Sequence, residues 1–400
     1  MKRYLAALLS VLLLLCLMAG CAGTTPNEPS NPQPTDKEDL PGPTGNEEVI
    51  KFGVFEPMTG ANAAWGEYEL RGIELANELY PEVLGKRIEL VIADNKSDVV
   101  EAANAAARLA ENSEVTIVLG SAGSSLAMAG GDIFLSNQVP AIGTSPTSPN
   151  VTLGNDYYFR VCFIDTFQGI ALANYAASEL GLKKGAIIYE ITNDTCVAMR
   201  APLTKAYNNL GGEILTEATF SVGDQDFNAQ LIAVMAKNPE VIFCPGNPTE
   251  VALLIKQARA LGYEDVMFMS SDAVDVPVFL EVGGDDLEGV YVTTHFSAEA
   301  PINDMTTVFT EAYSAKYDDE PGALTALAFD SYVAAVEAIK AANSTDGPAL
   351  QKALANLSFE GCTGRIEFDE NGDAIKNQVV LKIVENNQWK YGGTTLIEKN

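Results

Sequence analysis

The sequence predicts two α/β lobes, each a mostly parallel sheet covered by helices on both faces. Three observations lead to this fold class. Apolar strand-like runs alternate with amphipathic helices from Val49 onward. The same alternation begins again near Phe167, which indicates a second lobe of the same architecture. The 400 residues, 47% of them hydrophobic, are enough for more than one large core.

The first lobe is expected to open with four strands and the helices between them. The strands are expected at Val49–Phe55, Ile88–Ala93, Thr116–Leu119 and Val139–Gly143. The helices are expected at Trp65–Tyr80, Asp98–Asn112 and Ser124–Asn137. Short, almost continuously apolar runs of this kind are typical of parallel strands that are buried on both faces.

The second lobe repeats this order. Its strands are expected at Gly185–Glu190, Glu213–Phe220, Val241–Cys244, Val266–Met269 and Gly289–Thr294. Its helices are expected at Phe167–Leu180, Val197–Leu210, Asp226–Ala236 and Pro248–Leu261. In the last of these helices the apolar residues recur at helical spacing, so one face of the helix packs on the sheet.

The rest of the chain is expected to cross between the lobes. Helical segments near Asn303–Tyr317, Ala323–Ala342 and Ala349–Asn356 return to the first lobe, and the run Val379–Val384 joins the second. The predicted domains are residues 1–20 (signal), 21–48 (linker), 49–165 with 296–377 (lobe 1) and 166–295 with 378–400 (lobe 2). Parallel sheets bind ligands at the carboxyl ends of their strands, so the site is expected in the cleft between the lobes.

The first residues indicate export. Lys2 and Arg3 precede the apolar run Tyr4–Met18 and then Ala19-Gly20-Cys21, which resembles a bacterial lipoprotein signal. That resemblance implies that Cys21 becomes the new N-terminus and carries lipid. An ordinary signal or a membrane anchor with a chance cysteine is the alternative. The polar segment 22–48 has the composition of a flexible leash, although an irregular arm folded on the body remains an alternative.

The charge argues against a nucleic-acid partner. The formal net charge is −29, with 54 acidic and 25 basic residues, and no basic cluster stands out. Such a chain repels phosphate backbones and anionic headgroups, so the lipid on Cys21 is the only membrane contact that we expect.

Tests for an enzyme or a metal site are negative. The sole histidine, His295, has no Gly-x-Ser-x-Gly motif to serve, and we interpret it as a structural residue at a lobe crossing. The segment Asp369–Asp373 is similar to a calcium loop but lacks the required glycine and glutamate, so a turn at Asn371-Gly372 explains it better. We expect no enzyme, cofactor or metal. A disulfide between Cys196 and Cys244 is left open.

Two loops rich in small hydroxyl residues follow neighbouring strands of the first lobe. They are Leu119–Ser125 and Gly143–Pro149. Amide groups at a helix start, joined by hydroxyls, make a neutral socket for a small anion such as a carboxylate. In the alternative interpretation, Ser124 or Ser125 merely caps the helix and Thr147 merely shapes a proline turn.

These loops resemble those of the type 1 periplasmic binding proteins, and most closely the branched-chain amino-acid (Leu/Ile/Val) binding group that feeds ABC importers. The matching segments are Gly53–Gly60, Trp65-Gly66, Leu119–Ser125, Ser145–Thr147, Asp156–Arg160, Gln168-Gly169, Ala328–Tyr332 and Phe368–Asp373. The likeness extends from Val49 to about Trp389. It implies two Rossmann-like lobes joined by a hinge of several crossings, the periplasmic binding protein type 1 fold.

The resemblance also implies a division of roles in the site. It assigns Ser124, Ser145 and Thr147 to the α-carboxylate of an amino acid and Asp272 to its α-ammonium. It assigns Trp65 to covering the ligand's side chain. Asp272 is shorter than the glutamate typical of that place and has the alternative role of capping the turn before Val274. Trp65 has the alternative role of packing against the start of its helix.

Two tyrosines common in the family are replaced here. One of the positions falls in the loop that contains Asp194 and Thr195, and the other is Asn247. Asn247 stands before a proline with a glutamate three residues on, a pattern that also indicates a helix cap. Without aromatic walls, the site has room for a smaller or more polar ligand than leucine, and the three replacing residues would line it.

The expected function is that of a lipid-anchored solute-binding protein on the extracellular face of the cell membrane, or on the periplasmic side if the cell has an outer membrane. It would capture a small amino acid or an analogue and deliver it to an ABC permease. Two alternatives stay open: capture of another polar solute, such as an amide, a urea-like compound or an aromatic acid, and extracellular sensing.

Overall fold

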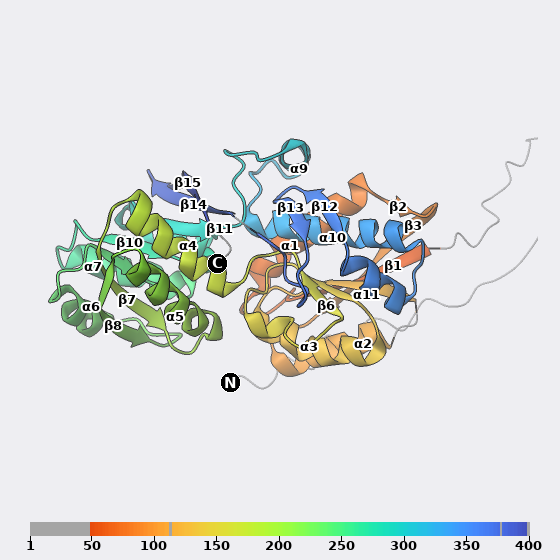
Figure 1. Ribbon diagram of the computed structural model, residues 1–400, viewed down its shortest axis with the longest axis horizontal. Helices are drawn as coiled ribbons and strands as arrows, with labels where there is room; N and C mark the ends of the chain where they lie inside the picture. Colours follow the sequence, from red (N-terminus) through yellow and green to blue (C-terminus); the bar gives the residue numbers. More distant parts are fainter. Residues whose placement is uncertain (1–48, 112–113, 377, 398–400) are drawn as a thin grey trace, which may run out of the picture. The chain divides into compact units, whose positions relative to one another are not determined.

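The computed structural model describes residues 49–111, 114–376 and 378–397. The expected signal, Cys21 and the leash therefore lie outside the described residues. The segment Glu47–Asn400 forms one compact unit. Within it the helices and strands gather around two sheets, one of six strands and one of seven (Figure 1).

The first sheet has the order β2-β3-β1-β4-β5-β6, and all neighbours are parallel except β2 and β3. Its strands are β1 (Val49–Glu56), β2 (Glu82–Val83), β3 (Lys86–Asp94), β4 (Val115–Gly120), β5 (Ala141–Gly143) and β6 (Tyr158–Arg160). The helices between them are α1 (Ala63–Leu79), α2 (Val99–Ala110) and α3 (Ser124–Asn137). Side chains of β1 alternate between faces: Phe52 and Val54 belong to the core that contains α1, and Phe55 to the core that contains α2 and α3.

The second sheet has the order β15-β14-β11-β10-β9-β7-β8, with β14 and β15 antiparallel to their neighbours. Its strands are β7 (Lys184–Glu190), β8 (Glu213–Phe220), β9 (Val241–Phe243), β10 (Met267–Ser270), β11 (Tyr291–Thr294), β14 (Gln378–Glu385) and β15 (Gln388–Leu396). Its helices are α4 (Asp165–Asn174), α5 (Asp194–Asn209), α6 (Asn228–Met235), α7 (Pro248–Ala260) and α8 (Pro277–Gly283). Helices α4 and α5 cover one face of the sheet, and α6, α7 and α8 cover the other.

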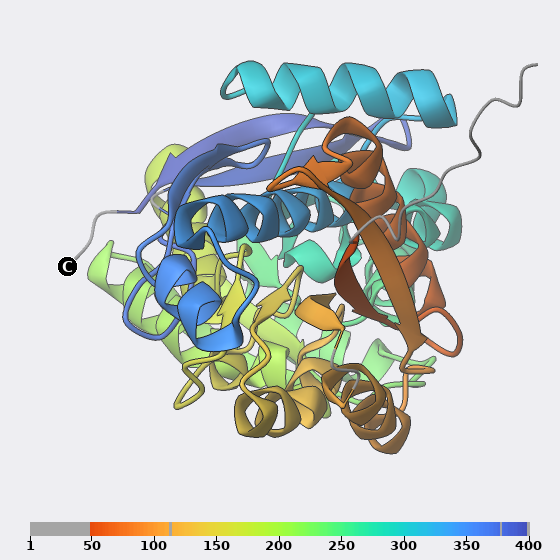
Figure 2. The ribbon, with the colours of Figure 1, turned by 90° about the vertical axis from the view of Figure 1, so that its right-hand side faces the viewer.

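The segment between β11 and β14 returns to the first sheet. It contains α9 (Asp304–Tyr317), α10 (Ala323–Ala342), α11 (Gly347–Leu354), β12 (Ser358–Gly361) and β13 (Gly364–Glu367). Helix α10 is buried along most of its length, and the ring of Tyr332 lies 5.2 Å from that of Phe52. Helix α9, cyan in Figure 2, lies at the outside of the same core and buries only a few residues.

The structure confirms the predicted α/β fold class with its parallel sheets. The domain boundaries stay predictions. The sequence interpretation missed the short strands β2, β6, β12 and β13, the last strand β15 and helix α8. It also placed the start of α5 too late, because Asn193 caps the helix by accepting a hydrogen bond from the Thr195 amide (3.0 Å).

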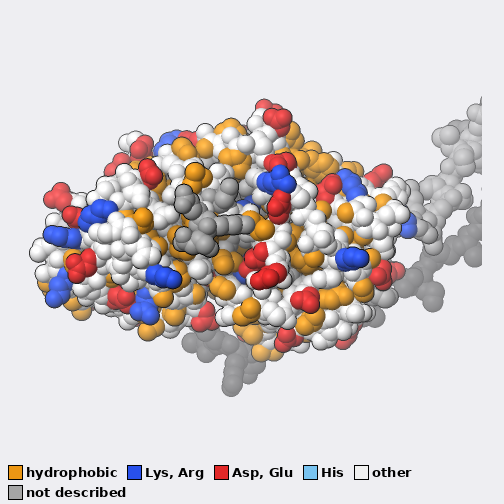
Figure 3. Space-filling view, in the orientation of Figure 1, with side chains coloured by type: hydrophobic (Ala, Val, Ile, Leu, Met, Phe, Trp, Pro, Cys, Tyr) orange, Lys and Arg blue, Asp and Glu red, His pale blue; other side chains and the backbone are white. Residues whose placement is uncertain are grey.

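The surface carries charges of both signs. On the face that Figure 3 shows, basic side chains are scattered singly among acidic and hydrophobic ones. In the part of the chain that the structure describes, no helix is both long and apolar enough to cross a membrane.

Candidate functional site

The predicted site residues lie near the carboxyl ends of parallel strands. Ser124 begins α3 after β4, and Ser145 and Thr147 follow β5. Thr195 lies in the first turn of α5 after β7, and Asp272 follows β10. Both sheets therefore contribute at the edge where such sheets bind ligands.

Two buried glutamates organise the hydroxyl-rich loops of the first sheet. Glu56 ends β1, where one carboxylate oxygen accepts the amide of Ala122 (2.8 Å) and the other accepts the hydroxyl of Thr144 (3.3 Å). Glu69 of α1 accepts hydroxyl hydrogen bonds from Thr144 and Ser145. Both carboxyl groups are fully buried. The carboxyl groups of Glu56 and Glu69 therefore connect the loop after β4 with the loop after β5.

This pair does not carry two charges at neutral pH. Burial raises the pKa of Glu56 well above its ordinary value, and the neighbouring charge of Glu69 raises it further. Burial also raises the pKa of Glu69, although hydrogen bonds from Glu56 and the two loop hydroxyls oppose the rise. The two groups share a proton, with Glu56 as its main holder.

The partners of Ser124 and Ser145 distinguish the two hydroxyls. Ser145 donates its only hydroxyl proton to Glu69, so its oxygen offers a lone pair to a ligand. Ser124 instead accepts the amide of Ser148 (3.1 Å), so this contact does not use its own proton. Helix α3 has Gly123 at its N-cap without a side-chain cap bond, so the alternative that Ser124 or Ser125 caps the helix is wrong.

The second loop is fixed by a buried arginine. Arg160 of β6 donates to the carbonyls of Pro146 (2.7 Å) and Ser148 (2.6 Å), which lie on either side of Thr147. Its Nε atom pairs with Asp373 (2.5 Å) in the turn after β13. The guanidinium thus sets the backbone position of Thr147.

Three predicted residues gather around an acid that the sequence interpretation did not select. Asp165 begins α4 and is fully buried, and its amide donates to the carbonyl of Thr147 (3.0 Å). Burial and the charge of Asp272 raise its pKa, hydrogen bonds from the hydroxyls of Thr147 and Thr195 lower it, and the net result is a pKa of about 8. Neither carboxylate oxygen has a hydrogen-bond partner of normal geometry. Thr147, Thr195 and Asp272 therefore converge on one buried carboxyl group.

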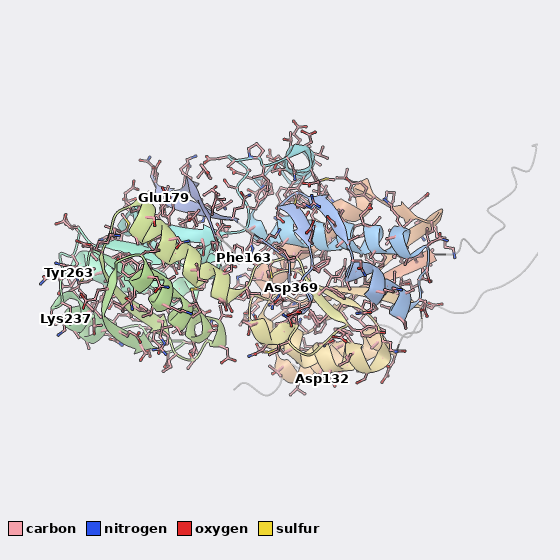
Figure 4. All side chains as sticks on the ribbon, in the orientation of Figure 1. Asp132, Phe163, Glu179, Lys237, Tyr263 and Asp369 are labelled. Carbon is pink, nitrogen blue, oxygen red and sulfur yellow. The ribbon has the colours of Figure 1, made fainter. Side chains whose placement is uncertain are left out.

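Asp272 is held by residues of the lobe crossings. Its carboxylate pairs with His295 Nε2 at 2.8 Å, and its amide donates to Gln168 (3.1 Å). The ring of His295 is buried and stacks on Phe163, with ring centroids 3.6 Å apart. Phe163 itself lies in the segment between β6 and α4 (Figure 4). The side chain of Asp272 thus contacts His295 and does not cap the turn before Val274, so that alternative is wrong. His295 does lie at a crossing, and it also orients Asp272, the residue predicted to bind the α-ammonium group.

The other predicted residues occupy separate places. Asp194 is exposed on the first turn of α5, not in a loop. Asn247 is the N-cap residue of α7, as the capping alternative expects, although its side chain makes no cap hydrogen bond, and its backbone amide donates to Glu190 (3.0 Å). Trp65 is half-buried and lies inside α1, not in a loop before it. Nothing in these positions tests their roles with a ligand.

The four described cysteines are all buried and free, including Cys196 and Cys244. The disulfide left open from the sequence is therefore not present. Among the residues that the structure describes, no group of three or more His, Cys, Asp or Glu side chains is placed to hold a metal ion.

Sequence reasoning missed Glu56, Glu69 and Asp165. Glu56 ends an apolar strand run, which is a detectable signal for a buried acid. Glu69 lies within a helix, and Asp165 has the pattern of an ordinary first-turn acid. Their burial depends on distant parts of the chain, and no local pattern reports it.

Comparison with known proteins shows which family this chain is similar to. A family model described as periplasmic binding protein matches residues 49–388. A leucine-, isoleucine-, valine-, threonine- and alanine-binding protein of Pseudomonas aeruginosa is 27% identical over 82% of this chain and 88% of that protein. The crystal structure of a leucine binding protein from Thermotoga maritima has a TM-score of 0.81 and 38% identity, covering 86% of this chain and 98% of that one. A branched-chain amino-acid transporter substrate binding protein from Streptococcus pneumoniae, solved with isoleucine, has a TM-score of 0.80 and 30% identity, covering 88% and 99%.

Proposed function

The chain belongs to the periplasmic binding protein family, and we propose that it captures a small amino acid and delivers it to an ABC importer. Members of this family are solute-binding proteins. The relatives named above bind leucine, isoleucine, valine, threonine or alanine. These amino acids share an α-carboxylate and an α-ammonium group, and the site offers complementary groups for both.

The convergence of Thr147, Thr195 and Asp272 on Asp165 carries the proposal. Thr147 follows the first sheet, whereas Thr195 and Asp272 belong to the second. The amide and hydroxyl groups near Ser124 suit a carboxylate, and the acid at Asp272 suits an ammonium. A molecule that carries both charges a short distance apart satisfies both groups at once.

The ligand is expected to be small or moderately polar. The family resemblance puts Asp194, Thr195 and Asn247 where tyrosines would otherwise form aromatic walls around a leucine-like side chain. Trp65, half-buried in α1, is the aromatic group available to cover an aliphatic side chain. Threonine and alanine therefore belong in the ligand panel beside the branched-chain amino acids.

Calorimetric titration of the purified protein with the twenty amino acids, and with benzoate, urea and acetamide, tests the proposal. We expect binding of at least one small amino acid. Asp272→Asn is expected to weaken it about ten- to a hundredfold through loss of a charge-assisted hydrogen bond. Binding of only the non-amino-acid solutes would replace the proposed ligand class, and unchanged affinity of the variant would remove Asp272 from the site.

We propose further that lipid on Cys21 anchors the protein to the outer face of the cell membrane. Cys21→Ala is expected to leave the protein unlabelled by radioactive palmitate and to release it from the membrane fraction. Retention of label in the variant would contradict the anchor. Delivery is tested separately by uptake of the bound amino acid in cells that lack the chain, because normal uptake would favour a sensing role.

A further inference from the structure

A charged pair is buried in the interior of the second sheet. Lys382 belongs to β14, which pairs with β11 on one side and with β15 on the other, and its side chain is only 11% exposed. Its ammonium group lies 3.0 and 2.9 Å from the two carboxylate oxygens of Asp275, whose side chain is 4% exposed. Taking two charges out of water costs free energy that their attraction often fails to recover, and apolar residues in the same place are frequently as stable. The pair is therefore weak evidence for stability, and its place in the fold requires another explanation.

The pair lies one short turn away from the acid predicted to bind the α-ammonium group. Asp275 follows the 3-10 turn Asp272–Val274, and its amide donates to the carbonyl of Asp272 (2.9 Å). Two successive residues at the end of β11 contact the two ends of this turn. The hydroxyl of Thr294 donates to Asp275 (2.6 Å), and Nε2 of His295 pairs with Asp272 (2.8 Å). Because so little backbone separates the two acids, fixing Asp275 also restricts where the carboxylate of Asp272 can lie.

We propose that Lys382 and Asp275 are positioning residues of the ligand site, which hold this turn so that Asp272 meets the α-ammonium group of the ligand. This inference rests on the proposed amino-acid function. The pair acts through Asp272 and not by contact with the ligand. Lys382 thereby connects the hairpin of β14 and β15 with the site. Loss of the pair should change ligand affinity without a comparable loss of stability.

Replacing the whole cluster by apolar side chains separates a positioning role from a structural one. In Asp275→Leu/Thr294→Val/Lys382→Met the two charges and the hydroxyl leave together, so no buried polar group of the cluster keeps an empty place beside it, and the midpoint of urea unfolding should change little. L-leucine, L-threonine and L-alanine are titrated calorimetrically into the full chain. We expect the affinity of the triple variant to fall about tenfold, because Asp272 is no longer held in place. Lys390→Met, the same change at an exposed lysine of the neighbouring strand β15, should retain the wild-type affinity.

A double-mutant cycle tests whether the cluster acts through Asp272. The triple change is repeated in the Asp272→Asn background, where it should cost less than about twofold in affinity, because the carboxylate that it positions is already gone. A general loosening of the lobe would instead weaken binding by the same factor in both backgrounds, and that result overturns the inference. Wild-type affinity in the triple variant overturns it as well and leaves the proposed function intact. Absence of binding of every amino acid to the unmodified protein overturns both.

Two single variants decide the question if the triple variant does not fold. Lys382→Gln keeps a hydrogen-bond donor for Asp275 but loses the charge, whereas Lys382→Arg keeps both. Affinity should fall in Lys382→Gln and should stay within about threefold of the wild type in Lys382→Arg. Equal affinities of these two variants contradict a role for the charged pair in positioning Asp272.

Discussion

Replacing Asp373 by alanine removes the carboxylate that pairs with a completely buried guanidinium. Arg160 is 0% exposed, and its Nε atom lies 2.5 Å from Asp373 Oδ1. The same carboxylate oxygen accepts the hydroxyl of Thr152 (2.7 Å). The change therefore removes the charge partner of Arg160, whose guanidinium also donates to the carbonyls of Pro146 and Ser148 on either side of Thr147.

The cost follows from what Arg160 keeps. Removing one partner of a buried ion pair costs about 3–5 kcal/mol, because the remaining charge stays buried without compensation. Arg160 retains hydrogen bonds to Pro146, Ser148 and Thr152, and the side chain of Asp373 is 13% exposed, so water reaches the vacated space. We therefore expect a loss at the lower end, about 3 kcal/mol in the free energy of unfolding.

Urea unfolding followed by tryptophan fluorescence measures this loss. Asp156→Ala, an exposed change at the turn before β6, serves as the control and is expected to stay within about 0.5 kcal/mol of the wild type. Amino-acid affinity should fall in Asp373→Ala as the loop around Thr147 loosens. A loss of stability below about 1 kcal/mol would contradict this expectation, because the charge of Arg160 would then have to be compensated by other groups.

Three other changes test the site. Because the pKa of Glu56 is raised in the folded protein, its contribution to stability is complete below the ordinary pKa of 4.5 and is lost as the pH rises through the raised pKa. Glu56→Gln should therefore flatten the fall of the unfolding free energy between pH 5 and 8 by up to about 1.4 kcal/mol per pH unit. An unchanged slope in the variant would contradict a shared proton. Ser124→Ala should weaken amino-acid binding about tenfold or more in a calorimetric titration. Ser145→Ala should instead lower the free energy of unfolding by about 1–2 kcal/mol, because it removes a hydrogen-bond donor from buried Glu69. Equal effects of the two variants on affinity would count against different roles for the two hydroxyls. The four described cysteines should resist iodoacetamide in the folded protein and react after unfolding, because burial raises the pKa of each thiol and blocks access of the reagent. Mass spectrometry of native and denatured samples measures this, and a thiol that is modified in the native sample would contradict the prediction.

Local patterns predicted the long elements well. Helix α10 occupies Ala323–Ala342 and β8 occupies Glu213–Phe220, both as the sequence indicated. The short strands β6 and β12 were missed because their residues, Tyr158–Arg160 and Ser358–Gly361, mix polar with apolar side chains and form no apolar run. The start of α5 was misplaced because Asn193 was interpreted as part of a loop and not as a cap.

The candidate site was predictable only in its outline. Topology places the ends of parallel strands together, and the family resemblance pointed to Thr147, Asp272 and the segment with Thr195. The hydrogen bonds of these residues could not be foreseen. Ser145 donates to Glu69 across many intervening residues, and Asp272 pairs with His295 of a different element. Such partners depend on the packing of helices and loops that are distant in the sequence.

The amino-acid sequence alone indicated the α/β architecture with its parallel sheets and the order of the main elements, and it pointed to the loops where a ligand site is proposed. These features follow from hydrophobic periodicity and from the rule that parallel strands present their carboxyl ends together. The packing of the folded chain sets which acids are buried and have a raised pKa. The charge of Glu56, Glu69 and Asp165 depends on how completely neighbouring elements exclude water, and exclusion of water is a property of the packed molecule and not of any segment.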